Sequence, residues 1–290
     1  MIGSIALPAM PLPSDGTRET TGAKAIGRAF ARAASERRAA LIPYVVAGYP
    51  DAETSFEIAL AAIDSGADLL EIGLPYSDPL ADGATLQRAS SAALKAGATL
   101  DRSIKLLRGV AKARPGVPLV PMCYANQVIG GGDGTDAANR LADAGASGII
   151  VADLTPDEGG PFEAAAGAAG LAVVYLVAPT TPVARRERIA VRTAGFLYCV
   201  SLVGVTGARS SLPPQVARLV RDVKRSSAVP VAVGFGVSRP AHVRALAKAG
   251  ADGVIVASAL VDALGPDGRD VNALIRLVRS LREAGATLAA

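Results

Sequence analysis

Two carboxylates near one predicted strand are the first candidates for chemistry. Glu71 interrupts the apolar run Leu69–Leu74, which has the length of a buried strand. A carboxyl group inside such a strand loses its hydration, which disfavours the charged form and raises the pKa. That property suits a general acid or base that works near neutral pH. A structural ion pair is the alternative for a single buried glutamate.

The polar loop after this run carries the second candidate. Asp78-Pro79 and Asp82-Gly83 follow the strand directly, and Gly73 and Pro75 shape the exit from it. Two carboxylates that sit close together in different environments can take different protonation roles. The segment therefore predicts an acid–base site in which Glu71 and Asp82 act differently.

Three later junctions are rich in small residues and indicate a phosphate site. They are Gly204-Val-Thr-Gly207, Gly234-Phe-Gly236 and Ala257-Ser258, and each follows a predicted strand. Small side chains let backbone N–H groups approach phosphate oxygens, and a helix N-terminus adds a favourable dipole. A single Gly-x-Gly is weak evidence, but three such junctions in one series predict an anion site.

A recurring unit shows which elements position these residues. Gly66-Ala67-Asp68, Gly145-Ala146-Ser147 and Gly250-Ala251-Asp252 each precede a short apolar run. Glycine favours the positive φ that often ends a helix, and a continuous apolar run is typical of a strand buried on both faces. Each unit therefore marks a helix-to-strand junction.

Eight apolar runs alternate with amphipathic helical stretches. This order favours a closed (β/α)8 TIM barrel over an open doubly wound sheet, and the active site of such a barrel lies at the carboxyl ends of the strands. A helix at about 25–39 should cover the bottom of the barrel, and Thr99 should cap the helix that follows Gly97. The predicted strands are Leu41–Ala47, Leu69–Leu74, Leu119–Cys123, Gly148–Ala152, Ala172–Val177, Gly195–Val200, Pro230–Val233 and Gly253–Ala257.

The expected organisation is one barrel domain over residues 25–290, which suits a chain of 290 residues. Residues 1–24 are expected to form a disordered extension, since Pro8, Pro11 and Pro13 interrupt its N-terminal part and no signal-peptide pattern is present.

Composition excludes several classes of function. The net charge of +4 is scattered, and the densest basic stretch, Arg28–Arg38, has the spacing of a solvated helix face, so no nucleic-acid partner is expected. No apolar run reaches the roughly 20 residues that span a bilayer. Cys123 and Cys199 are expected as buried thiols in a reducing compartment, and the single His242 excludes a two-histidine metal site. A cytoplasmic protein without a metal is expected.

The segment Leu70–Gly83 resembles the signature of the tryptophan synthase alpha chain family. The resemblance covers about residues 25–281, and further segments match in the same order. They are Pro43–Pro50, Tyr124–Asn126, Val151–Asp153, Tyr198, Gly204–Gly207 and Gly234–Val237.

The resemblance implies a lyase of tryptophan biosynthesis. Its reaction would be the retro-aldol cleavage of indole-3-glycerol phosphate to indole and glyceraldehyde 3-phosphate. No cofactor is expected in this chain, because pyridoxal phosphate belongs to the partner beta chain. The expected assembly is an alpha2beta2 heterotetramer, with partner contacts in the loops after the second, third and fourth strands.

The resemblance also assigns site residues by motif. Glu71 matches the acid/base and Asp82 the carboxylate that holds the indole N–H. Tyr198 matches a tyrosine near the acid/base, and Thr206 a threonine of a mobile loop that contacts the aspartate of the loop after strand 2. The indole pocket would be lined by Tyr44, Leu86, Met122, Tyr124 and Ile150, and the phosphate held by Gly207, Gly236 and Ser258.

Five residues depart from the family pattern: Ala84, Thr155, Leu202, Val203 and Ala257. Thr155 stands where proline is frequent, in the partner-facing loop after strand 4, so weaker partner binding is expected. Ala257 replaces the usual glycine of the last phosphate junction and keeps its N–H donor.

Three other functions remain open. A stand-alone indole-3-glycerol phosphate lyase would share every catalytic residue. A noncatalytic subunit that activates its partner is disfavoured by the intact Glu71 and Asp82. The third is a different phosphate-binding barrel enzyme, such as an isomerase or an aldolase. A Schiff-base aldolase is disfavoured because none of the eight predicted strands contains a lysine.

Overall fold

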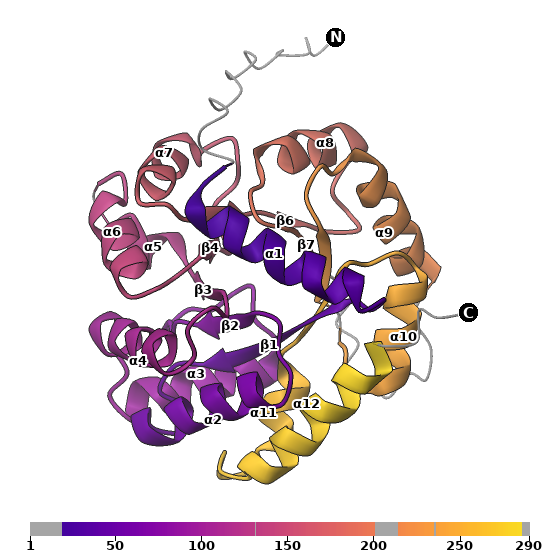
Figure 1. Cartoon of the computed structure of the whole chain (residues 1–290). Helices are drawn as coiled ribbons and strands as arrows, with labels where there is room; N and C mark the ends of the chain where they lie inside the picture. Colours follow the sequence, from indigo (N-terminus) through magenta and orange to yellow (C-terminus); the bar gives the residue numbers. More distant parts are fainter. Residues whose placement is uncertain (1–18, 131, 201–213, 235, 286–290) are drawn as a thin grey trace, which may run out of the picture.

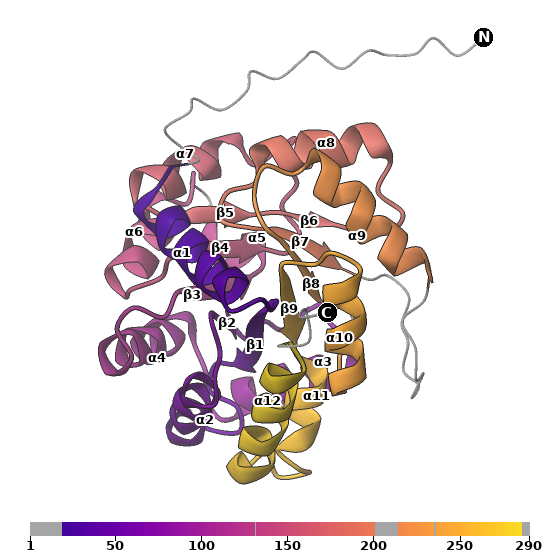
Figure 2. The same cartoon turned by 45° about the vertical axis from the view of Figure 1, so that its right-hand side comes forward.

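The computed structural model describes residues 19–130, 132–200, 214–234 and 236–285. Its strands are parallel and form one sheet in the order β5-β4-β3-β2-β1-β9-β8-β7-β6. The expected barrel is therefore confirmed, with its strands enclosed by helices (Figures 1 and 2). The strands are β1 Ala40–Val46, β2 Leu70–Gly73, β3 Leu119–Cys123, β4 Gly148–Val151, β5 Ala172–Val174, β6 Leu176–Val177, β7 Leu197–Val200, β8 Val231–Gly234 and β9 Gly253–Val256.

The fifth predicted strand is divided in two. The run Ala172–Val177 breaks at Tyr175, so that β5 pairs with β4 and β6 pairs with β7. The Tyr175 carbonyl still accepts a hydrogen bond from the Tyr198 N–H at 3.0 Å. One segment thus joins both ends of the sheet and closes it, and the nine strands occupy the eight positions of the predicted barrel.

Helices α2 to α12 follow the strands and surround them (Figure 1). Local capping explains several helix starts: the side chains of Asp51 and Thr99 accept hydrogen bonds from the N–H groups of Thr54 and Arg102, as expected for Thr99. The helices are α2 Ala52–Asp64, α3 Ala84–Lys95, α4 Leu100–Ala113, α5 Ala125–Val128, α6 Thr135–Asp143, α7 Gly160–Ala168, α8 Val183–Arg192, α9 Pro214–Ser226, α10 Pro240–Lys248, α11 Ser258–Ala263 and α12 Val271–Gly285.

Helix α1 runs Thr21–Ser35 and crosses the end of the barrel at the start of the strands (Figure 1). It begins four residues earlier than predicted, because the Thr20 side chain caps it by accepting from the Ala23 N–H at 3.0 Å. Residues 21–24 are thus helical rather than part of a disordered extension, whereas residues 1–18 lie outside the described part. Ile26 and Phe30 on α1 pack into the barrel interior, as expected for a helix that covers the bottom.

Alternate strand residues divide the core into two layers. The inner cluster lies inside the barrel and includes Ile42, Leu69, Val120 and Ile150, with Ala172, Phe196, Ala232 and Ile255 around the ring. The outer cluster lies between strands and helices and includes Leu70 and Ile72. Glu71 therefore points to the interior, because side chains alternate along a strand.

The predicted helix ends are also confirmed. Gly66, Gly145 and Gly250 have φ of 111°, 97° and 98°, which is the conformation expected where a helix turns into a strand. Cys123 and Cys199 are free and buried. Within the described residues, no helix is long and apolar enough to cross a membrane.

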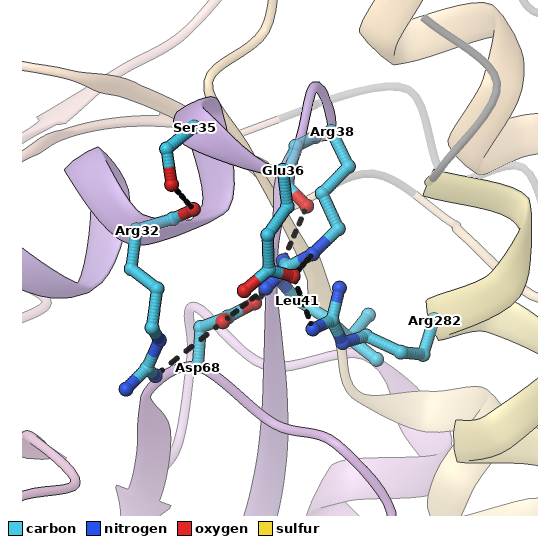
Figure 3. A network of polar contacts seen from close by, with 8 residues as sticks. Arg32, Ser35, Glu36, Arg38, Leu41, Asp68 and Arg282 are labelled. Atoms are coloured by element: carbon cyan, nitrogen blue, oxygen red, sulfur yellow. Dashed lines mark hydrogen bonds and ion pairs between the residues drawn. The ribbon is translucent and has the colours of Figure 1, made fainter.

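A buried polar network ties the bottom of the barrel together (Figure 3). Asp68, just before β2, accepts from the Arg38 guanidinium at 2.5 and 2.8 Å and from the Leu41 N–H at 2.9 Å. Both charged side chains are 2% exposed. Glu36 accepts from Arg38 at 2.8 Å and from Arg282 of α12 at 2.9 Å. The network joins the first strand, the second strand and the last helix.

Candidate active site

Glu71 lies inside the barrel, on the inward face of β2. It is paired in register with Tyr44 of β1 and Val120 of β3 and is 1% exposed. Within the described residues, neither carboxyl oxygen has a hydrogen-bond partner, and no ion pair involves this side chain. Burial, with a smaller contribution from the Asp82 charge, raises the pKa of Glu71 to about 8. An unpaired carboxylic acid of this kind is available for proton transfer, whereas the ion-pair interpretation is not supported.

Asp82 enters the same space from the loop after β2. A turn holds it, because the Asp82 N–H donates to the Pro79 carbonyl at 3.0 Å, and the Gln87 side chain donates to the Asp82 carbonyl at 2.9 Å. Burial raises the pKa of Asp82 to about 6, and a hydrogen bond with Tyr124 opposes the shift. At neutral pH the two carboxylates therefore differ: Glu71 is mostly protonated and Asp82 mostly charged.

Tyr124 anchors the loop that carries Asp82. Its hydroxyl accepts from the Ala81 N–H at 3.0 Å, and its ring stacks on Tyr76 with centroids 5.0 Å apart. Burial and the charge of Asp82 raise the pKa of Tyr124 to about 12, so its hydroxyl stays neutral. The loop after β2 is thus held against the end of β3.

Two residues that sequence reasoning missed complete this anchor. The Gln127 side chain donates to the Pro75 carbonyl at 3.0 Å and accepts from the Tyr124 N–H at 3.0 Å. Tyr76 accepts from the Asn126 side chain at 3.3 Å. Tyr76 lies within the carboxylate loop, and its aromatic ring was the available signal. Gln127 at the third position of a helix is a local capping signal, but its contact with Pro75, 52 residues away in the chain, has no signal in the sequence.

The predicted pocket residues lie around the two carboxylates. Tyr44, on β1, and Tyr198, on β7, are buried and interact electrostatically with both Glu71 and Asp82; burial is the main reason that the pKa values of both tyrosines lie far above normal. Ile150 belongs to the inner cluster, and Leu86 packs against the apolar cluster that contains Tyr44. Met122 packs against both of these clusters. The structure therefore brings together the predicted acid/base pair and the predicted pocket lining.

The phosphate junctions are described only in part. Gly236 follows β8 with φ of 48°, and space is open beside it. Ser258 begins α11, directly after β9. Ala257 has φ of −119°, so this position does not need the left-handed conformation that favours glycine. Thr206 and Gly207, like Leu202-Val203, lie outside the described residues.

No group of three or more His, Cys, Asp or Glu side chains within the described ranges is arranged to hold a metal ion. The chemistry that the described site offers is acid–base catalysis by two carboxylates beside an aromatic, largely apolar pocket.

Fold and site together define a (β/α)8-barrel protein with a buried glutamate and a partly buried aspartate at the carboxyl ends of its strands. The family model for the tryptophan synthase alpha chain matches residues 30–287. The chain belongs to this family.

Individual relatives agree over most of the chain. A tryptophan synthase alpha chain of Roseiflexus sp. (strain RS-1) is 45% identical over 259 residues, which cover 89% of this chain and 98% of the relative. One of Gloeobacter violaceus is also 45% identical, over 91% of this chain and 95% of its own. A structure of Mycobacterium tuberculosis tryptophan synthase superposes with a TM-score of 0.83 at 38% identity, covering 90% of this chain and 98% of that chain.

Proposed function

We propose that Glu71 and Asp82 are the catalytic carboxylates of this chain. As a tryptophan synthase alpha chain, the protein is a lyase that cleaves indole-3-glycerol phosphate to indole and glyceraldehyde 3-phosphate. The observation that carries the assignment is the buried Glu71 carboxyl, which has no hydrogen-bond partner in the described part of the chain, beside the less buried Asp82. Cleavage needs one proton delivered to C3 of indole and one removed from the glycerol 3′-hydroxyl.

Glu71 is suited to both transfers. With a pKa of about 8 it begins protonated at neutral pH and can donate to C3, which makes the ring an indoleninium leaving group. The carboxylate so formed can accept the proton of the 3′-hydroxyl as the carbon–carbon bond breaks, which regenerates the acid. Asp82, charged at neutral pH, accepts a hydrogen bond from the indole N–H and stabilises the positive charge that develops on the ring.

The remaining pocket residues bind and orient the substrate. Tyr44, Leu86, Met122, Tyr124 and Ile150 supply an apolar wall for the indole ring, and Tyr198 lies beside the acid. Backbone N–H groups at Gly236 and at the start of α11, Ser258, are placed after neighbouring strands, where barrels commonly bind phosphate. Thr206 and Gly207 are assigned to loop closure and to phosphate binding from their place in the sequence.

The decisive test is Glu71→Gln, which keeps the size of the side chain and removes the acid. Turnover of indole-3-glycerol phosphate should fall by more than the roughly 10²–10⁴-fold of a single general acid–base step, while the substrate still binds. Glu57→Gln, on the exposed face of α2, is the matched control. Near-native turnover by purified Glu71→Gln would show that the assignment is wrong.

We further propose that residues 25–290, extended at the N-terminus by the first turn of α1 from Thr21, fold as one domain. We propose that this domain acts in the cytoplasm, without a cofactor of its own, in an alpha2beta2 heterotetramer with a pyridoxal phosphate-containing beta chain. Leu80, on the loop after β2, is 91% exposed, and this is one of the loops in which the family pattern places partner contacts. The loop after β4 with Thr155 extends the same face. Titration with the cognate beta chain should raise indole formation; no complex at tens of micromolar would favour a stand-alone lyase.

A further inference from the structure

Tyr44 and Gly73 occupy one space on neighbouring strands. Tyr44 is paired in register with Glu71, and Gly73 lies two residues further along β2, on the same inward face. A Cβ atom added at Gly73 would lie 1.8 Å from the Tyr44 hydroxyl oxygen and 2.4 Å from the ring carbon that bears it. The Tyr44 ring therefore leans over the end of β2, in the space that any side chain at position 73 would need.

A second tyrosine–glycine pair, on β7 and β8, repeats this arrangement. Tyr198 of β7 is paired with Ala232 of β8, and a Cβ at Gly234, two residues further, would lie 2.4 Å from the Tyr198 hydroxyl oxygen. Here the residue beside the tyrosine is an alanine, whereas beside Tyr44 it is Glu71. Only the first of these two tyrosines leans over a strand that carries a carboxyl group.

The burial of Glu71 requires a cover at the mouth of the barrel. Glu71 is completely buried although it lies near the carboxyl end of its strand, where the barrel opens. Tyr44 itself is 4% exposed and packs on Val46, Ala89 and Val261. The ring is thus packed against the helices α3 and α11 at the barrel mouth.

We propose that Tyr44 is a positioning residue that covers the Glu71 carboxyl against water, and that position 73 is glycine because the Tyr44 ring needs its space. The inference depends on the proposed catalytic role of Glu71. Among the described residues, the titratable groups that interact with Glu71 are Asp82 from the loop after β2, Tyr44 from β1 and Tyr198 from β7. Asp82 is the charged one, and it remains in every variant below.

The test measures the pH dependence of kcat/KM for indole formation. Since Glu71 must begin protonated, activity should fall above its pKa of about 8. Tyr44→Ala admits water to Glu71. The alkaline limb of the profile, which is the pH range in which activity falls, should therefore move at least one pH unit lower, a tenfold change in proton concentration. Tyr44→Phe keeps the ring and should keep the limb in place. Gly73→Ala should displace the ring and also move the limb lower, with a loss in kcat larger than the change in KM.

Combining the two changes tests the contact itself. Tyr44→Ala with Gly73→Ala should be no worse than Tyr44→Ala alone, because no ring remains to be displaced. Gly109→Ala is the matched control, since its Cβ would meet Phe56 at 3.1 Å between α2 and α4. Tyr44→Leu replaces Tyr44→Ala if thermal unfolding shows that the alanine variant is not folded, and it should shift the limb in the same direction.

The outcomes separate this inference from the proposed function. An unshifted alkaline limb in a folded Tyr44→Ala or Tyr44→Leu variant, with Glu71→Gln inactive, would overturn the role of Tyr44 alone. Fully additive losses in the double variant would overturn the explanation for Gly73. An active Glu71→Gln variant would instead overturn the proposed function.

Discussion

Asp68 offers the sharpest test of how this barrel is held together at its base. Its side chain accepts two hydrogen bonds from the Arg38 guanidinium and one from the Leu41 N–H, and a second arginine, Arg32, lies 3.6 Å away (Figure 3). Asp68→Ala would remove every one of these acceptors. It would leave the Arg38 charge buried, with Glu36 as its remaining carboxylate partner.

The expected loss of stability follows from those contacts. Removing one partner of a buried ion pair costs about 3–5 kcal/mol, and the lower end applies here because Glu36 still accepts from Arg38. The unpaired Leu41 N–H adds about 1 kcal/mol, so the total is about 4 kcal/mol. At roughly 2–4 °C per kcal/mol, which is the range for somewhat smaller domains, the melting temperature should fall by roughly 8–16 °C.

The assay is thermal and urea unfolding followed by circular dichroism, supported by tyrosine fluorescence, because the chain has 6 tyrosines and no tryptophan. Asp222→Ala is the control: its pair with Arg225 is exposed, so its loss should cost less than about 1 kcal/mol. Changing Asp68 to Leu together with Arg38 to Met should recover much of the stability, since no buried charge then remains. A loss below about 1 kcal/mol for Asp68→Ala would refute the reasoning from the buried pair.

Three further predictions concern the site and the helix beneath it. Asp82→Asn should cut turnover strongly and change substrate binding little, because an amide carries no charge to meet the developing cation; full activity would exclude the electrostatic role. Since the folded pKa of Glu71, about 8, lies above its usual 4.5, its contribution to stability is complete below pH 4.5 and is lost as pH rises through 8. The free energy of unfolding should therefore decline over that window more steeply than in Glu71→Gln, and parallel curves would contradict the shift. Gly22→Ala should loosen α1 and speed its proteolysis, because the added Cβ would lie 1.7 Å from the Ser147 carbonyl oxygen; unchanged cleavage would show that α1 docks differently.

The barrel was largely predictable from the sequence because its signals are local. Apolar runs of strand length, glycines at helix ends and capping residues such as Thr99 act within a few residues. Each run contains a strand, although the run Ala172–Val177 is divided into two. The burial of Glu71 followed from its place in an apolar run and is confirmed. Its catalytic role, like that of Asp82, stays a prediction from the motif until turnover is measured.

Tertiary structure alone decided the rest, because the remaining features depend on residues far apart in the chain. The break at Tyr175 follows from closure, since the segment must pair with β4 on one side and β7 on the other. Arg38 meets Asp68 across 30 positions. The Tyr44 ring lies over Gly73 because parallel pairing in a barrel sets their register. Periodicity tells which residues are buried, but only the register of paired strands determines which buried side chains share a space.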